Sequence, residues 1–252
     1  MITVDLPSTE SLAAASTAFT FALVGIGLLI VGSAIAAATW ARSLNGWALG
    51  GVSFVLSQTA QVVALFLFGP LIAAFASAPL QEASRALILS TAARRVRGEK
   101  PSFAFGFGHG AIDLLTSSLI PTLSAVIILG GISDGSIFVG LTAEVTEKVR
   151  AVAVYLASQT FFSAALLILQ GVLMLGLHAL LTGIVLRAVV RGGGARTVGV
   201  GLLLPIAIHT PVAVVRTLFP QATTPVLLGA LLVAYLVYRR GQETTAESAP
   251  SQ

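Results

Sequence analysis

The sequence has no cysteine among its 252 residues, so disulfide bonds, cysteine nucleophiles and thiolate metal sites are excluded. It is also poor in charge, because only 10% of its residues are charged, against about 25% in an ordinary soluble domain. So few charged side chains cannot cover the water-facing surface of a globule of this size. A soluble enzyme, a disordered chain and a nucleic-acid-binding domain are therefore excluded, and the pI of 10.1 does not indicate a nucleic-acid partner.

Apolar sequence is what the chain has in abundance: 56% of its residues are hydrophobic, and the mean hydropathy is +0.96. A membrane-spanning helix needs about 20 mostly apolar residues to cross about 30 Å of hydrocarbon. Seven such runs lie between charge clusters and turn signals, and Gly69-Pro70 separates the second from the third. The predicted spans are 17–41, 47–68, 70–93, 102–129, 164–191, 198–219 and 224–238. We therefore expect an all-α, polytopic membrane helix bundle with about seven transmembrane helices.

The basic residues predict the orientation of these spans. Ten of the 14 lie on alternate loops, and Lys148, Arg150 and Arg216 lie on the opposite side. The ten are Arg42, Arg94, Arg95, Arg97, Lys100, Arg187, Arg191, Arg196, Arg239 and Arg240. By the positive-inside rule, the N-terminus is expected outside and the C-terminus in the cytoplasm, for a multi-pass protein of the plasma membrane.

This orientation divides the chain into an extracytoplasmic segment (1–16), a single transmembrane domain (17–239) and a polar, disordered cytoplasmic tail (240–252). An outer segment near 131–163 interrupts the transmembrane domain. It is predicted to include an amphipathic interfacial helix, because Glu144, Glu147, Lys148 and Arg150 fall on one wet side.

Six ionisable side chains are predicted to lie at membrane depth, where such groups are costly and are by default functional. They are Glu82, Arg85, His109, Asp113, His178 and His209. At about 1.5 Å per residue, the acids and imidazoles lie about 10 to 19 Å from the predicted cytoplasmic ends of four spans. Four helices therefore present acid or imidazole groups close to one level in the bilayer.

The sequence spacing of these residues also indicates which of them can act together. Glu82 and Arg85 are three residues apart on one helical face, where a guanidinium can keep a carboxylate ionised and oriented. His109 and Asp113 are four residues apart, a spacing that suits two ligands of one metal, or an imidazole and the carboxylate that orients it.

With His178 and His209, these residues predict a Zn²⁺ site formed by His109, His178, His209 and Asp113, with Glu82 as the general base acting on water. Two alternatives use the same groups. Without a metal, Glu82 activates water and the histidines stabilise an oxyanion. In a proton- or ion-coupled transporter, the acid and the imidazoles form a relay.

Glycines surround the first of these histidines, at Gly106, Gly108 and Gly110. Because glycine has no side chain, neighbouring backbones or an extended substrate can approach closely here.

The two motifs resemble those of the YhfC-type intramembrane proteases. Gln81-Glu82-Ala83-Ser84-Arg85 is similar to the family's EExxR motif, and Gly108-His109-Gly110-Ala111-Ile112-Asp113 to its GHGxxE motif. The family is related to the PrsW proteases and to the type II CAAX prenyl endopeptidase group, whose FxxxH motif is matched by Phe105 and His109. The resemblance covers about residues 80–213.

The resemblance implies an endopeptidase that hydrolyses peptide bonds in or beside the bilayer, on a membrane-embedded or prenylated peptide substrate among membrane lipids. It implies that Glu82 activates water, that Arg85 orients Glu82, and that His109, His178 and His209 act as metal ligands or oxyanion stabilisers. Gln81 stands where the family has glutamate, and Asp113 is the shorter acid. A non-catalytic membrane scaffold of the same fold is the alternative that these two differences support.

Overall fold

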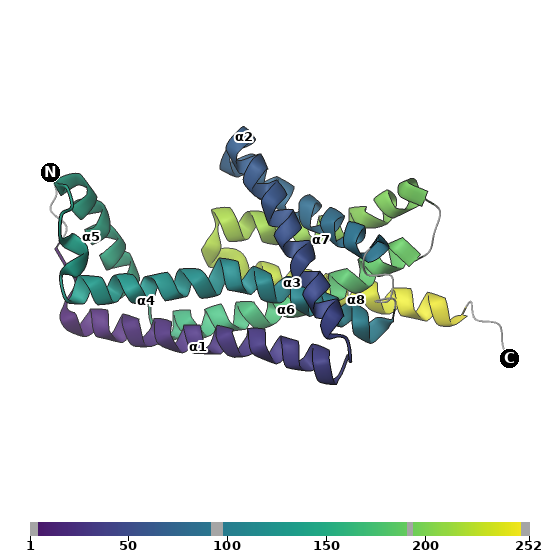
Figure 1. The fold of residues 1–252 in the computed structure, drawn as a ribbon, viewed down its shortest axis with the longest axis horizontal. Helices are drawn as coiled ribbons and strands as arrows, with labels where there is room; N and C mark the ends of the chain where they lie inside the picture. Colours follow the sequence, from purple (N-terminus) through teal and green to yellow (C-terminus); the bar gives the residue numbers. More distant parts are fainter. Residues whose placement is uncertain (1–4, 92–97, 191–193, 248–252) are drawn as a thin grey trace. The chain divides into compact units, whose positions relative to one another are not determined.

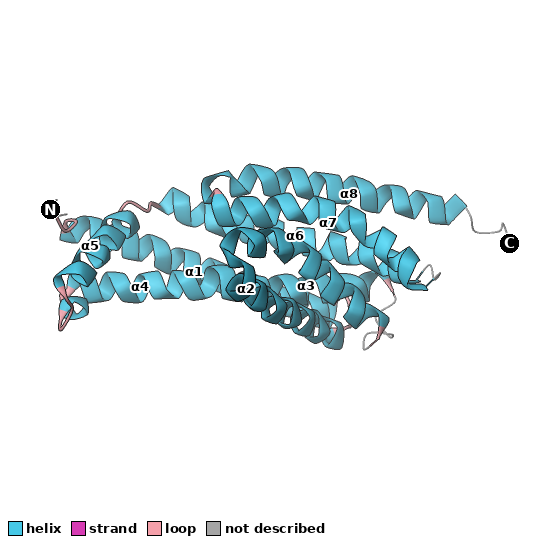
Figure 2. Cartoon of the chain, turned by 90° about the horizontal axis from the view of Figure 1, so that it is seen from above, coloured by secondary structure: helices cyan, strands magenta, loops and turns pink. Residues whose placement is uncertain are grey.

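The computed structural model describes residues 5–91, 98–190 and 194–247. Over these ranges the chain is helical with short connections and contains no strand (Figure 2). Arg94, Arg95, Arg97 and Arg191, which the orientation prediction uses, lie outside the described residues, as do residues 248–252 of the predicted tail.

Six helical stretches of the described chain are long and apolar enough to cross a membrane. They are α1 (Thr9–Thr39), α2 (Leu44–Ser90), the stretch Glu99–Ser133, α6 (Phe161–Val190), Val198–Leu218 within α7 (Gly194–Leu218), and Pro220–Gln242, most of which lies in α8 (Thr223–Glu247). The stretch Glu99–Ser133 consists of α3 (Glu99–Leu114), a π-helical turn (Leu115–Leu119) and α4 (Ile120–Ser133). The predicted all-α, multi-pass fold is thereby confirmed.

The seventh span is found within α2, which consists of two helical segments joined at a break in the helix. Gly69 has φ 82° and ψ 174°, a non-helical backbone conformation that favours glycine, and Pro70 follows it. The chain turns back there (Figure 1), since Ser53 Oγ lies 3.3 Å from Ser84 Oγ and Ser77 Oγ donates to Gln61 Oε1 at 3.2 Å. The break predicted at Gly69-Pro70 is confirmed, and α2 forms an antiparallel helical hairpin.

The helical boundaries differ from the predicted spans mainly at the ends. Helix α1 begins at Thr9 and α8 continues to Glu247, whereas the spans were expected to begin at residue 17 and to end at 238. The π-helical turn ends at Leu119, two residues before Pro121, which has no N–H for the carbonyl four residues earlier.

The described residues form two compact units: unit 1 comprises those within 1–29 and 114–171, and unit 2 comprises those within 30–113 and 172–252. The core of unit 1 is apolar. Its buried cluster consists of Leu12, Ala15, Ala125, Leu129, Ile132, Ala153 and Leu156. Phe21 also stacks on Phe161, with ring centroids 4.4 Å apart.

Unit 1 includes the predicted amphipathic helix, which the structure has as α5 (Ala143–Ala157). Thr142 caps it by accepting a hydrogen bond from the backbone N–H of Val145. Lys148 forms an exposed ion pair with Glu144 at 2.6 Å. An interfacial place for α5 stays a prediction.

In unit 2, helix α3 packs closely against two neighbours through its glycines. A Cβ on Gly108 would overlap the backbone carbonyl of Trp47 in α2, and a Cβ on Gly106 would lie 2.5 Å from Ala179 Cα in α6. The close backbone approach predicted for this glycine run is confirmed. Because α3 contacts α2 on one face and α6 on another, it brings together the side chains of all three helices.

Candidate functional site

All six predicted site residues lie in unit 2 and are buried. Glu82 and Arg85 come from the second half of α2, His109 and Asp113 from α3, His178 from α6 and His209 from α7. The side chains of Glu82, Arg85, His109 and His178 are 0% exposed. Hydrogen bonds join all of these residues except His109 into one network, and the His109 ring lies beside that of His178 at a tilt of 48°.

Glu82 and Arg85 form the ion pair that their spacing predicts. Arg85 Nη1 lies 2.5 Å from Glu82 Oε2. The other carboxylate oxygen, Oε1, lies 2.9 Å from His209 Nδ1. An ionised carboxylate only accepts hydrogen bonds, so His209 donates from Nδ1. Glu82 is thus held in place at both oxygens, by a guanidinium from its own helix and by an imidazole from α7.

The second nitrogen of the guanidinium reaches the middle histidine. Arg85 Nη2 lies 2.9 Å from His178 Nδ1, and His178 Nε2 lies 3.2 Å from Asp113 Oδ2. Since a guanidinium has no acceptor, His178 Nδ1 accepts and Nε2 carries the proton that it donates to Asp113. The structure therefore pairs Asp113 with His178, whereas sequence spacing suggested His109.

Arg216 is a member of this site that the sequence reasoning missed. Its Nη1 and Nη2 lie 3.0 Å from Asp113 Oδ2 and Oδ1, a bidentate pairing. The orientation prediction counted Arg216 only as a basic residue of the outer side. Arg216 follows His209 by seven residues, two helical turns along one face of α7, and this spacing was the available signal.

His109 is held by Gln81, the residue next to Glu82. His109 Nε2 lies 3.2 Å from Gln81 Oε1, and Gln81 Nε2 donates to Ser77 Oγ at 3.2 Å. Ser77 in turn donates to Gln61 Oε1, which also accepts from Gln58. This chain of donors leaves the carbonyl end of Gln81 facing His109, so His109 donates from Nε2.

The other nitrogen of that ring has no partner. His109 Nδ1 is buried and makes no hydrogen bond with the described residues. A buried polar atom without a partner costs free energy, and in a native structure it points to a missing ligand, water or ion. With its proton on Nε2, His109 presents a lone pair at Nδ1, which is what a metal ion or the proton of a water molecule requires.

The three imidazoles are spaced as the ligands of one zinc ion would be. The ring centroids of His109 and His178 are 4.8 Å apart, and those of His178 and His209 are 5.3 Å apart. Two imidazoles bound to one tetrahedral zinc at about 2.0 to 2.1 Å have centroids about 5 Å apart. Each ring also has one nitrogen against an oxygen acceptor of Gln81, Asp113 or Glu82, the outer contact that fixes metal-binding histidines.

As the side chains stand, no three His, Asp or Glu groups among the described residues converge to hold an ion. The lone pair of His178 Nδ1 is taken by Arg85, and Asp113 is engaged by Arg216 and His178. The three imidazoles thus fit zinc in residue type and ring spacing, but His178 could bind an ion only by releasing Arg85. Asp113, predicted as a ligand, makes the contacts of an orienting carboxylate.

Comparison with known protein families gives a match over most of the chain. The YhfC intramembrane metalloprotease family matches residues 13–234, which covers α1 to α8 and all the residues of the site. No curated protein and no solved structure matches the chain. Since the match covers most of the sequence and includes both motifs, the chain belongs to the YhfC intramembrane metalloprotease family.

Proposed function

We propose that the buried cluster of Glu82, Arg85, His109, His178 and His209 is the centre of an intramembrane endopeptidase, which hydrolyses peptide bonds in or next to the bilayer. Membership of the YhfC family supports an intramembrane protease. The cluster supplies a carboxylate that can act as a base and imidazoles that can bind a metal. The observation that carries the proposal is the buried, unpartnered lone pair of His109 Nδ1 in a group of three imidazoles beside a carboxylate. We place the protein in the plasma membrane, with a membrane-embedded peptide as substrate.

Glu82 acts on the attacking water. The carboxylate has about four lone-pair positions, and Arg85 and His209 use two of them, so a water can donate to a third. Glu82 takes a proton from this water as the oxygen attacks the scissile carbonyl carbon. The proton then passes to the leaving nitrogen as the C–N bond breaks, which yields a carboxylic acid and an amine.

Arg85 and Gln81 are positioning residues in this scheme. Arg85 keeps Glu82 ionised in a site from which water is largely excluded. Gln81 holds the proton of His109 on Nε2, and a neutral amide does this without adding a third carboxylate to the cluster. We infer that His109, His178 and His209 hold a Zn²⁺ ion, which supplies a Lewis acid for the scissile carbonyl and the attacking water.

The test is proteolysis by purified protein in vesicles that contain a library of transmembrane peptides, with products identified by mass spectrometry. Glu82→Gln removes the proton acceptor and is expected to lower turnover about 10²- to 10⁴-fold. Glu144→Gln is the matched control, because Glu144 also pairs with a cation on its own helix but lies on the surface. Wild-type turnover in Glu82→Gln would refute the assignment.

A non-catalytic scaffold is the second candidate, because Arg85 occupies the lone pair of His178 that an ion would need. The same experiment separates the two. A scaffold gives no cleavage products in the wild type, and its Glu82→Gln variant changes stability or partner binding alone.

A further inference from the structure

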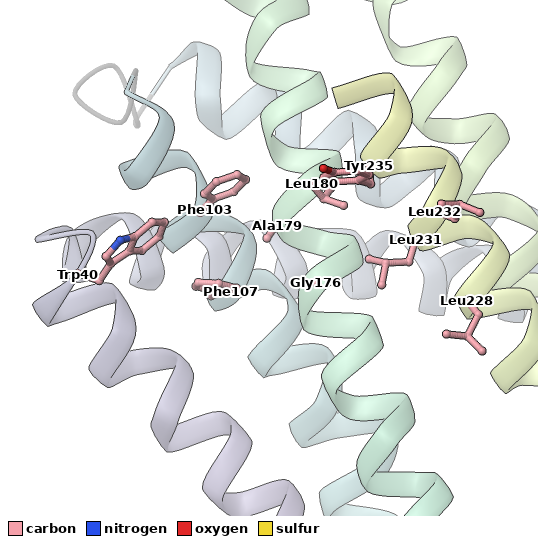
Figure 3. A pocket seen from close by; sticks show the side chains of 10 residues that line it. All are labelled: Trp40, Phe103, Phe107, Gly176, Ala179, Leu180, Leu228, Leu231, Leu232 and Tyr235. Carbon is pink, nitrogen blue, oxygen red and sulfur yellow. The ribbon is translucent and has the colours of Figure 1, made fainter. Parts of the chain in front are cut away.

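An apolar groove of about 630 Å³ lies in unit 2, on another face of α6 from the catalytic cluster. Its floor is α6 at Gly176, Ala179 and Leu180, and its walls come from the end of α1, from α3 and from α8 (Figure 3). Trp40 and Leu232 line it and are 48% and 59% exposed, so the groove is open on its outer side. Its lining is almost entirely apolar, which suits an apolar occupant.

The two ends of the groove differ in chemistry. At one end Trp40 stacks on Phe103, with centroids 6.1 Å apart, and Lys100 Nζ lies 5.6 Å from the centre of the Trp40 ring. The far end is formed by leucines of α8, of which Leu228 is the last (Figure 3). Aromatic rings beside a cation are typical of the membrane–water interface, whereas leucines are typical of its interior.

The groove reaches from near the aromatic level to about the depth of one leaflet. Phe103 also contacts Tyr238, with ring centroids 5.5 Å apart, so Tyr238 marks the interfacial level on α8. Tyr238 and Leu228 are ten residues apart in sequence, which is about 15 Å of helix. Half of a hydrocarbon core of about 30 Å is the same length.

The volume and the lining favour one kind of occupant. A helix about 10 Å across occupies about 800 Å³ over the seven residues from Leu228 to Tyr235, so it could place only one face in this space. An extended peptide would leave its N–H and C=O groups without partners, because the lining offers the Tyr235 hydroxyl, the Trp40 indole and otherwise apolar side chains. A single hydrocarbon chain has neither problem.

We propose that this groove binds one acyl chain of an anionic glycerophospholipid, whose phosphate lies beside Lys100 at the aromatic end. The bound chain has a consequence for the catalytic cluster. Gly106 of α3 packs on the backbone of α6 at Ala179 and against the carbonyl of His178. An acyl chain between Phe107 and Ala179 therefore supports the helix crossing that positions His109 and His178.

Tryptophan fluorescence can report on the occupant of the groove. It has two tryptophans, of which Trp40 lines the groove and Trp47 instead donates to Ser33. In a Trp47→Phe protein, Trp40 fluorescence is measured in phosphatidylcholine vesicles that contain acyl-brominated phosphatidylglycerol, or acyl-brominated phosphatidylcholine at the same mole fraction. One lysine beside an anionic headgroup is worth about 1 kcal/mol, so we expect about fivefold preferential association of the anionic lipid from the quenching.

Variants locate the site. Lys100→Glu is expected to abolish the preference, and Lys148→Glu, which alters the other lysine of the chain, to leave it unchanged. Filling the groove with Leu228→Phe and Leu232→Phe together is also expected to abolish it, whereas Leu236→Phe on the same helix, outside the lining, keeps it. Trp40→Phe, which leaves Trp47 as the reporter, is expected to show no preference.

Equal quenching by the two lipids in the Trp47→Phe protein would overturn the proposal. So would a preference that survives Lys100→Glu, or a loss of the preference when a transmembrane peptide is added, since a peptide would then be the occupant. None of these outcomes depends on proteolysis, so the lipid proposal is tested independently of the catalytic assignment.

Discussion

Unit 1 and unit 2 both contain apolar helices, but they bury different side chains. Among the described residues, Thr122 is the one polar residue of unit 1 that is buried as a whole. The Glu144–Lys148 ion pair of unit 1 is exposed, and its Glu147–Arg150 pair is partly exposed. Unit 2 buries Glu82 and Arg85 completely, together with three histidines. Unit 1 shows that this sequence can pack membrane helices without a fully buried ion pair.

A fully buried ion pair is therefore not needed to hold such helices together, and polar contacts between spans are commonly worth only about 1 kcal/mol. A buried ion pair is also seldom more stable than apolar residues of the same volume. The buried groups of unit 2 are costly, and the proposed catalytic role would explain why they are kept.

The largest expected difference in stability between the units is that of their ion pairs. Arg85→Met leaves the Glu82 carboxylate buried without its cation, which is expected to cost about 3 to 5 kcal/mol of unfolding free energy. Lys148→Met, which breaks the exposed pair of unit 1, is expected to cost less than about 1 kcal/mol. Unfolding in mixed detergent micelles measures both, and equal losses would contradict the comparison.

Asp113 is expected to act on the site through His178 and not as a ligand. Asp113→Asn removes the ionised acceptor of His178 Nε2 and the partner of Arg216, so activity and zinc affinity should each fall about 10- to 100-fold. Asp113→Glu restores the carboxylate and is expected to recover most of both. A purely structural role would lower stability in Asp113→Asn without changing the zinc affinity of the folded fraction.

The glycines provide a smaller test, with effects of opposite sign. Gly108→Ala places a Cβ against the carbonyl of Trp47, and this overpacking is expected to cost about 1 to 3 kcal/mol. Gly130→Ala in unit 1 meets open space, so its better helix propensity should stabilise by up to about 1 kcal/mol. Thermal unfolding of the two variants measures the difference, and destabilisation of both would show that unit 1 is as closely packed there as unit 2.

The sequence predicts most of this fold because membrane spans are long and their breaks have local causes. Length and hydropathy give the spans, and Gly69-Pro70 gives the turn within α2. The boundaries of α1 and α8 were missed because polar residues can extend a helix beyond the hydrocarbon. The π-helical turn before Pro121 depends on a local rearrangement that composition does not determine.

Most members of the site were predictable, as was the Glu82–Arg85 pair within one helix, but the pairings between helices were not. Their predicted depth places Glu82, His109, His178 and His209 at one level of the membrane. In the structure these four side chains lie in one buried cluster. Which carboxylate faces which imidazole depends on the order of the helices around the site, and a single sequence does not contain that order. This is why Asp113 was assigned to His109 and why Arg216 was missed.

Zinc content tests the central claim most directly. Elemental analysis of the purified wild type is expected to give about one zinc per chain, with none retained in His109→Ala and wild-type content in the unit 1 control Glu144→Gln. Proteolytic activity should follow the zinc. Equal zinc in the wild type and His109→Ala, or full proteolysis by a zinc-free wild type, would contradict the claim that the three imidazoles around Glu82 form the metal centre of this protease.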